Sequence, residues 1–200
     1  MYKLELYLIR HGKTICNENR LYCGTSNPSL SYGGKDELIG LKKDIKYPIC
    51  NKYFTSGAKR ANETFEILYP NIKYEILTGF SEYNFGDFEM KSYEVLKEKK
   101  EYINWITDEI GEVSCPNGES KREYRNRVKN EFIDFIKRCE IENIESSLIV
   151  SHGGTIGTIL ELFYNKNKNF YEWQPKCGNG YKLIITIDEK INIDKVEEVK

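Results

Sequence analysis

The chain has 200 residues, of which 40% are hydrophobic and 30% are charged, with 30 basic and 31 acidic side chains. This length favours one domain with a substantial core. The net charge of −1 excludes a global field that attracts nucleic acid or an anionic membrane surface. Any binding of anions must therefore depend on locally placed arginines.

The N-terminus and the cysteines indicate a cytoplasmic protein. Residues 1–6 carry charges within a short apolar run, which excludes a secretory signal, and no stretch approaches the roughly 18 apolar residues that span a bilayer. No two of the six cysteines form a C-x-x-C pair. We interpret them as reduced, small hydrophobic residues and expect no structural zinc site.

The first half of the chain alternates between strand and helix patterns. Spacing of apolar residues predicts a strand at 3–9, a polar loop through Asn27 and Pro28, a helix near 34–45, a strand at 52–56, a helix at 58–69 and a strand at 72–77. The helix at 58–69 stops before Pro70 because proline cannot continue it.

The second half predicts one or two helices within 91–110, a loop at 115–118, a helix at 119–139, a strand at 147–151, a helix from 153 to about 164 and a last strand at 181–187. Strands that alternate with helices predict a three-layer α/β/α sandwich with a mostly parallel central sheet. We expect residues 1–200 to form one domain, with a small helical and loop cap inserted at about 79–118.

The chain contains only two histidines, and each follows an apolar run and precedes glycine. His11 ends the run at 6–9 and His152 ends the run at 148–150. The carboxyl ends of parallel strands line a ligand crevice, so two strands that are far apart in sequence deliver one imidazole each to the same place. This arrangement indicates nucleophilic or acid–base chemistry.

Further polar residues follow the same strand ends. Arg10 offers a fork of donors suited to phosphate oxygens, Asn17 lies one turn away, and Arg60 stands in the first turn of a helix, where anions are favoured. Glu82 and Glu89 are carboxylates among aromatic residues, and apolar surroundings raise a carboxyl pKa. Taken singly, each of these has an ordinary alternative as a packed histidine, a solvated arginine or a solvated loop acid.

Two common nucleotide motifs are excluded. Gly33-Gly34-Lys35 is followed by Asp36, where a phosphate-binding P-loop needs Ser or Thr. No G-x-G-x-x-G follows a predicted strand, which argues against a dinucleotide site.

Together, these residues resemble the histidine phosphatase superfamily, in its phosphoglycerate mutase-like branch. The resemblance extends from Leu4 to about Leu162. It rests on R-H-G-x-T-x-x-N at 10–17, the turn-rich segment 24–34, Ser56 with Arg60-Ala61 and Thr64, the stretch 82–89, Pro116-Asn117-Gly118-Glu119-Ser120 and Ser151-His152-Gly153-Gly154.

The resemblance implies a role for each matched residue. His11 would attack phosphorus and become a phosphohistidine, and Glu82 would protonate the leaving oxygen. The phosphate would be bound by Arg10, Asn17, Arg60, His152 and Gly153. Further candidates for substrate contact are Thr14, Cys23, Gly24, Tyr83 and Phe85. Neither a metal nor another cofactor is implied.

Within the family, the chain is most similar to α-ribazole phosphatases of cobalamin biosynthesis, through residues 85–90 and 116–119. Phe88 stands where those proteins often carry Trp, and Gly57-Ala58 and Glu37-Leu38 also depart from their pattern. The alternatives are a broad phosphatase of sugar or nucleoside monophosphates and a catalytically inactive binding module. A phosphoglycerate mutase is disfavoured because no Arg-Arg-Tyr segment is present.

The expected partner is therefore a small phosphorylated substrate, with no nucleic acid and no membrane, and a homodimer stays open. Five aromatic residues of the predicted cap could stack on a nucleoside-like base or could belong to the core: Phe80, Tyr83, Phe85, Phe88 and Tyr93.

Overall fold

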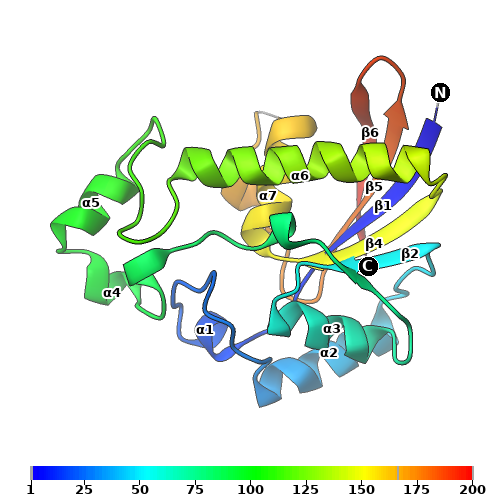
Figure 1. The fold of residues 1–200 in the computed structure, drawn as a ribbon. Coiled ribbons are helices and arrows are strands. Elements are labelled where there is room, and N and C mark those ends of the chain that lie inside the picture. The colour runs from blue at the N-terminus through cyan, green and yellow to red at the C-terminus, as the bar shows by residue number, and fades with distance from the viewer. Residues whose placement is uncertain (1, 166, 200) are drawn as a thin grey trace.

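The central sheet of the computed structural model, which describes residues 2–165 and 167–199, has six strands in the order β3-β2-β4-β1-β5-β6 (Figure 1). Strands β3, β2, β4 and β1 pair in parallel, whereas β5 and β6 are antiparallel to their neighbours. Helices α6 and α7 lie over one face of the sheet, and α2 and α3 lie over the other. The expected α/β/α sandwich with a mostly parallel sheet is confirmed.

The described residues form strands, α-helices and short 3₁₀ helices, the last labelled η. They are β1 (Tyr2–Arg10), α1 (Ile15–Glu18), α2 (Tyr32–Asp44), β2 (Lys52–Thr55), α3 (Lys59–Leu68), β3 (Glu75–Ile76), η1 (Thr78–Phe80), η2 (Gly86–Phe88), α4 (Tyr93–Leu96), α5 (Lys100–Ile106), α6 (Lys121–Ile141), β4 (Ser146–Ser151), α7 (Gly153–Phe163), η3 (Phe170–Trp173), β5 (Gly180–Ile187) and β6 (Ile191–Val199).

Strand β1 shows how the sequence builds both faces of the core. Successive side chains of a strand point to opposite faces. Leu4, Leu6 and Leu8 therefore pack in the cluster beneath α6 and α7, while Ile9 packs in the cluster beneath α2 and α3. On the second face Lys3 is exposed and Glu5 and Tyr7 are half-buried, so charges interrupt the first half of this strand although it lies inside the sheet.

Helix α6 confirms the predicted long amphipathic helix. Ser120 caps it by accepting a hydrogen bond from the backbone N–H of Glu123, whose side chain accepts from the N–H of Ser120 in return. The buried face carries Tyr124, Val128, Phe132, Phe135, Ile136 and Cys139. The polar side chains of its first two turns lie close to the carboxyl edge of the sheet and reach the site described below.

Three elements differ from the sequence expectations. Strand β3 contains two residues instead of six, and the single turn α1 falls where a loop was expected. The strand at 181–187 is not the last one, because β6 pairs with it along the sheet edge. Four of the nine residues of β6 are charged, as is typical of an edge strand, and they conceal the alternation that predicts a strand.

The segment that follows η1 leaves the sandwich and returns to it. Helices α4 and α5 lie apart from the sheet, beyond its carboxyl edge, and the chain comes back as the start of α6 (Figure 1). Trp105 and Tyr102 anchor α5 through the same core cluster that contains Phe88. In the part of the chain that the structure describes, no helix combines the length and apolar character needed to cross a bilayer.

Candidate active site

Three neighbouring parallel strands end at one edge of the sheet and place polar residues side by side. Arg10 at the end of β1 pairs with Ser151 at the end of β4, so His11 and His152 directly follow paired positions. Their ring centroids are 5.2 Å apart. Strand β2 ends one step earlier, where Thr55 pairs with Val150, and it brings Ser56 to the same edge. The predicted convergence of the two histidines is present in the structure.

The imidazole of His11 is buried and is held in one orientation. Its Nδ1 lies 2.7 Å from the carbonyl oxygen of Gly12, which can only accept a hydrogen bond, so Nδ1 carries the ring proton. Burial lowers the pKa of His11 well below its usual value, and the charges of Arg60 and Arg10 lower it further. The ring is therefore neutral at pH 7, and the lone pair of Nε2 is available as a nucleophile.

Arg10 presents part of its guanidinium group to the same space. Nη1 donates to the carbonyl of Pro175 at 2.9 Å, whereas Nε is buried with no hydrogen-bond partner in the described part of the chain. The group lies against the backbone of Gly153, where an added Cβ would stand 3.0 Å from Cζ of Arg10. Glycine at 153 thus lets the guanidinium approach the start of α7, with one donor unused.

Arg60 is 1% exposed, which is unusual for arginine. Its guanidinium donates to the carbonyls of Gly24 at 2.9 Å and Ser26 at 3.0 Å. The first turn of α3 is also tied to the loop after β1, because Thr64 donates to the Arg60 carbonyl and accepts from the N–H of Gly12. Arg60 is therefore a fixed positive charge beside both imidazoles.

Asn17 and Thr14 form one unit at the start of α1. The side-chain oxygen of Asn17 accepts hydrogen bonds from the backbone N–H of Thr14 at 2.9 Å and from its hydroxyl at 3.0 Å. This pairing fixes which end of the Asn17 amide is the acceptor and leaves its NH₂ as the donor. Thr14 is buried, and its hydroxyl donates its hydrogen bond to Asn17.

Glu82 lies in polar surroundings. One carboxylate oxygen accepts from the hydroxyl of Tyr124 at 2.8 Å and from the N–H of Tyr83 at 3.0 Å, and the other accepts from the N–H of Gly154 at 3.0 Å. The expectation of a carboxyl group in apolar surroundings is therefore wrong. Burial raises the pKa of Tyr124 well above its usual value, so this phenol stays protonated and donates.

An ion pair that the sequence analysis missed holds the backbone on which Glu82 stands. Arg127 of α6 bonds Glu119 through two parallel contacts of 2.8 Å. It also donates to the carbonyls of Gly79 at 2.9 Å and Ser81 at 3.0 Å. Arg127 lies three residues after Tyr124, so helical spacing places both on one side of α6, but no pattern in the sequence links that side to Glu82.

Glu89 was a candidate acid in the sequence, and the structure gives it a different task. Its carboxylate accepts hydrogen bonds from the backbone N–H groups of Gly24 at 2.9 Å, Thr25 at 2.9 Å and Ser26 at 3.1 Å. The same loop supplies the carbonyls that Arg60 binds. Glu89 therefore anchors the loop 23–26 from one side while Arg60 holds it from the other.

The remaining candidates for substrate contact divide into two groups. Gly24 lines the cavity described below. Tyr83 does not, because its ring is buried in the core and its hydroxyl donates to the Glu119 carbonyl at 2.7 Å. Phe85 and Cys23 are also absent from the cavity lining. Phe85 stacks on Tyr83 with ring centroids 4.8 Å apart. Burial raises the pKa of the Cys23 thiol to about 12. The aromatic residues Phe80 and Phe88 are likewise core residues, so stacking of a base on Phe80, Tyr83 or Phe88 is not supported.

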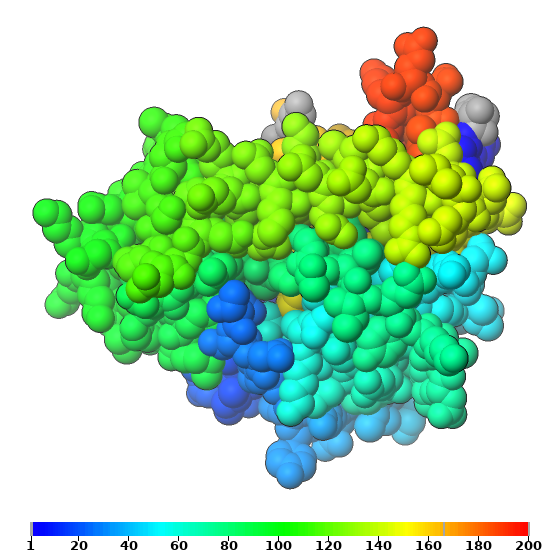
Figure 2. Space-filling model, in the orientation of Figure 1, coloured from blue at the N-terminus to red at the C-terminus, as the bar shows by residue number. Residues whose placement is uncertain are grey.

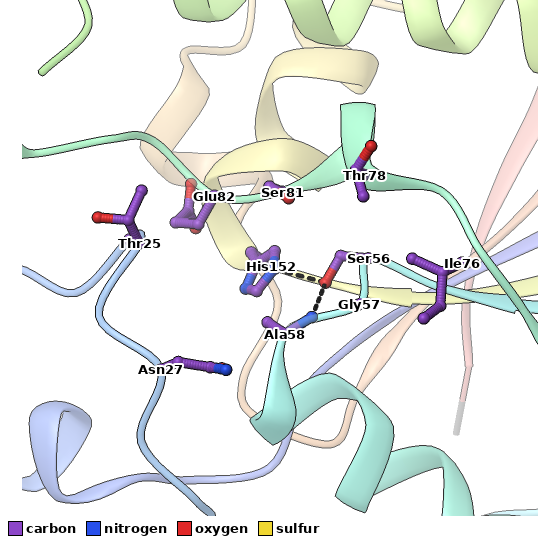
Figure 3. Close-up of a pocket in the computed structure, with 11 residues that line it drawn as sticks. Thr25, Asn27, Ser56, Gly57, Ala58, Ile76, Thr78, Ser81, Glu82 and His152 are labelled. Atoms are coloured by element: carbon purple, nitrogen blue, oxygen red, sulfur yellow. Dashed lines mark hydrogen bonds between the residues drawn. The ribbon is translucent and has the colours of Figure 1, made fainter.

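A cavity of about 410 Å³ opens beside His152 and Glu82. Figure 2 shows the surface hollowed between the blue, cyan and green segments, and Figure 3 shows the lining side chains. Beyond Ser56, Glu82 and His152, the lining is neutral: Gly24, Thr25, Asn27, Gly57, Ala58, Ile76, Thr78 and Ser81. Hydroxyl, amide and aliphatic groups thus surround the place where the remainder of a ligand would lie.

Two neutral imidazoles, two guanidinium groups and a carboxylate lie at this edge of the sheet. Of these, His152 and Glu82 line the cavity, whereas Arg10, His11 and Arg60 are not among its lining residues. Within residues 2–165 and 167–199, no group of three or more His, Cys, Asp or Glu side chains is arranged to hold a metal ion. The set of donors suits a tetrahedral anion such as a phosphoryl group.

Comparison with known proteins agrees with this chemistry. Residues 6–192 match the family described as the histidine phosphatase superfamily (branch 1). The adenosylcobalamin/alpha-ribazole phosphatase of Salmonella typhimurium is 28% identical over 162 residues, which cover 78% of each chain. A 2,3-bisphosphoglycerate-dependent phosphoglycerate mutase of Bartonella henselae is also 28% identical, over 203 residues and 94% of each chain.

The fold comparison leads to the same group. The alpha-ribazole phosphatase from Shigella flexneri superposes with a TM-score of 0.78 at 25% identity, over 95% of this chain and 94% of that one. The family match spans nearly the whole chain, including every residue of the converging strand ends. The chain therefore belongs to the histidine phosphatase superfamily, branch 1.

Proposed function

We propose that the protein is a phosphomonoesterase that works through a phosphohistidine on His11. The observation that carries this proposal is the state of His11: its ring is buried and neutral, and its proton is committed to Gly12 on the side away from Nε2. A neutral imidazole with one free lone pair is a nucleophile, and the neighbouring guanidinium groups supply charge for the phosphoryl oxygens.

In the first step, Nε2 of His11 attacks phosphorus, the P–N bond forms and the bond from phosphorus to the ester oxygen breaks. Arg10, Arg60, His152 and Asn17 hold the non-bridging oxygens, and Gly153 allows Arg10 to lie close. Glu82, which must carry a proton before the ester is cleaved, gives that proton to the leaving oxygen. In the second step, Glu82 takes a proton from water, water attacks phosphorus, and inorganic phosphate leaves as the P–N bond breaks.

The two arginines support a reaction that needs no metal ion. Phosphoryl transfer depends mainly on positioning and on stabilising charge on the equatorial oxygens. Two fixed guanidinium groups provide that charge, so we expect an excess of EDTA to leave the rate unchanged. A rate that falls with EDTA and returns with a divalent cation would contradict this part of the proposal.

For the substrate, we propose α-ribazole 5′-phosphate or a similar neutral sugar or nucleoside monophosphate. Two observations support a neutral leaving group. The residues that line the described cavity include no Lys or Arg that could bind a substrate carboxylate. Relatives of similar length carry the name adenosylcobalamin/alpha-ribazole phosphatase.

A panel of phosphomonoesters tests the proposal. We expect release of inorganic phosphate from α-ribazole 5′-phosphate and other neutral monoesters, at kcat/KM values above that for 3-phosphoglycerate. Conversion of 3-phosphoglycerate to its 2-isomer in the presence of 2,3-bisphosphoglycerate would instead show a mutase. Binding of phosphate without turnover of any ester would show an inactive binding module.

A further inference from the structure

The imidazole of His152 is held at one nitrogen and unpaired at the other. Its Nε2 lies 2.8 Å from the hydroxyl oxygen of Ser56, as the dashed line in Figure 3 shows. Its Nδ1 is buried and has no hydrogen-bond partner among the described residues. A buried, unpaired ring nitrogen in a crevice that suits an anion is a group that awaits a ligand.

The contacts of Ser56 determine where the ring proton lies. Its oxygen accepts a hydrogen bond from the backbone N–H of Ala58 at 3.4 Å (Figure 3). The hydroxyl has one proton of its own, and Nε2 of His152 is the acceptor that the described contacts offer it. If Nε2 carried the ring proton, Oγ of Ser56 would accept from it as well as from Ala58, and the buried hydroxyl proton would be left without an acceptor among the described contacts.

Burial and the surrounding charges keep the His152 ring neutral, so only one nitrogen carries a proton. Burial lowers the pKa of His152 well below its usual value, and the charge that lowers it most is that of Arg60 on α3. His11 and Arg10 act in the same direction from the end of β1, and Arg127 does so from α6. The carboxylate of Glu82 faces the start of α7 through the N–H of Gly154.

We propose that Ser56 is a positioning residue that fixes His152 as the Nδ1–H tautomer, so that the ring donates a hydrogen bond to a phosphoryl oxygen. The opposite tautomer would direct a lone pair at that oxygen and repel it. The inference rests on the proposed phosphoryl transfer at His11, and it adds a residue that acts through His152. The partner of one ring nitrogen sets which tautomer the other presents.

The backbone places Ser56 for this role without help from its side chain. The N–H of Ser56 donates to the carbonyl of Val150 at 3.0 Å, which continues the pairing of β2 with β4. Replacement by alanine should therefore remove the hydroxyl and leave the chain path unchanged. Ser147 of β4 is a matched control, because it is also a buried serine but lies four residues before Ser151, at the opposite end of the strand from His152.

Long-range ¹H–¹⁵N NMR spectra of histidine-labelled protein test the inference without any substrate. The chain has two histidines, so only two imidazole patterns are expected, and His152→Gln assigns them. We expect the Nδ1–H pattern for both rings in the wild type at pH 7.5. In Ser56→Ala, the His152 pattern should move to Nε2–H, while Ser147→Ala should keep both patterns. An Nε2–H pattern for His152 in the wild type would overturn the inference, whether or not Ser56→Ala folds.

Binding and turnover test the consequence. We expect Ser56→Ala to weaken binding of inorganic phosphate at least tenfold at pH 7.5 and to lower kcat/KM by a similar factor. Both losses should shrink as the pH falls, because a doubly protonated ring donates from either nitrogen. Equal affinities of Ser56→Ala and wild type at pH 7.5 would overturn the role. Absence of turnover in every variant would refute the proposed function instead, and the tautomer measurement would still stand.

Discussion

The floor of the crevice and its rim are built by different means. The floor consists of Arg10, His11, Arg60 and His152, which follow the ends of β1, β2 and β4. The rim consists of residues 79–89 and the loop 23–26, which belong to no strand of the sheet. The register of the sheet fixes most of the floor, whereas side-chain contacts from distant elements fix the rim.

This difference separates the groups that bind and attack the phosphoryl group from those that handle the leaving group. In the floor, His11, Arg60 and His152 are buried and Arg10 is half-buried, and together they carry the charges and imidazoles that a phosphoryl group requires. The rim carries Glu82 and the neutral groups of the cavity, and it depends on Arg127, Tyr124 and Glu89 for its shape. We therefore expect changes in the floor to abolish the reaction, and changes in the rim to alter which esters react and how fast.

The largest effect is expected in the floor, for His11→Ala. Removing the nucleophile should lower kcat for an aryl phosphate by about 10⁴-fold or more, since the residues that remain cannot form the intermediate. Circular dichroism should show an unchanged fold. Activity within tenfold of the wild type would exclude His11 as the nucleophile.

Glu82→Gln tests the chemical role of the rim. The variant cannot donate a proton, so kcat for an alkyl phosphate should fall by about 10²-fold. For p-nitrophenyl phosphate, whose leaving group needs no proton, we expect a loss below about tenfold. Equal losses for the two esters would remove Glu82 from the acid role.

Arg127→Ala tests whether the rim depends on its ion pair. The change removes five hydrogen bonds to residues 79–82 and 119 and leaves Glu119 half-buried without its ion-pair partner, so we expect a loss of about 2 kcal/mol in the free energy of unfolding. We also expect kcat for alkyl esters to fall by about tenfold. Arg125→Ala is the control, because Arg125 lies on the same helix as Arg127 but pairs with Glu161 of α7. Equal losses of activity in the two variants would refute a specific role for Arg127.

The smallest effect is the dependence of stability on pH. The folded pKa values of both histidines lie well below the usual 6.5, so below pH 6.5 the unfolded chain binds more protons than the folded one. The free energy of unfolding should therefore fall with the pH, by about 1.4 kcal/mol per histidine between neutral pH and pH 5.5. Urea unfolding at both pH values, for the wild type and His152→Gln, measures it. Identical pH dependence in the two proteins would show that His152 titrates normally in the fold.

Sequence predicted the floor because local rules determine it. An apolar run before a histidine and a glycine indicates a strand end, and parallel strand ends meet at one edge. The family resemblance also identified Glu82, but not its environment. That environment depends on Tyr124, which lies 42 residues away in the chain, and on the N–H of Gly154. No local pattern contains such a contact.

The same reasoning explains the other differences. Tyr83 and Phe88 were candidates for substrate contact or stacking because aromatic side chains serve surfaces and cores equally well. Packing against Trp105 decides that they belong to the core. Ser56 was part of a recognised motif, but its hydrogen bond to His152 crosses from β2 to the end of β4. Strand β6 was not predicted because charged residues on an exposed edge interrupt the alternation of apolar and polar residues that identifies a strand.

Trapping the intermediate is the most direct test of the central claim. The wild type is mixed with an aryl phosphate, denatured within milliseconds in alkali, where a phosphoramidate survives, and digested for mass spectrometry. We predict one added phosphoryl group on the peptide that contains His11, and none in His11→Ala. A phosphoryl group on His152, or turnover that labels no histidine, would contradict the account.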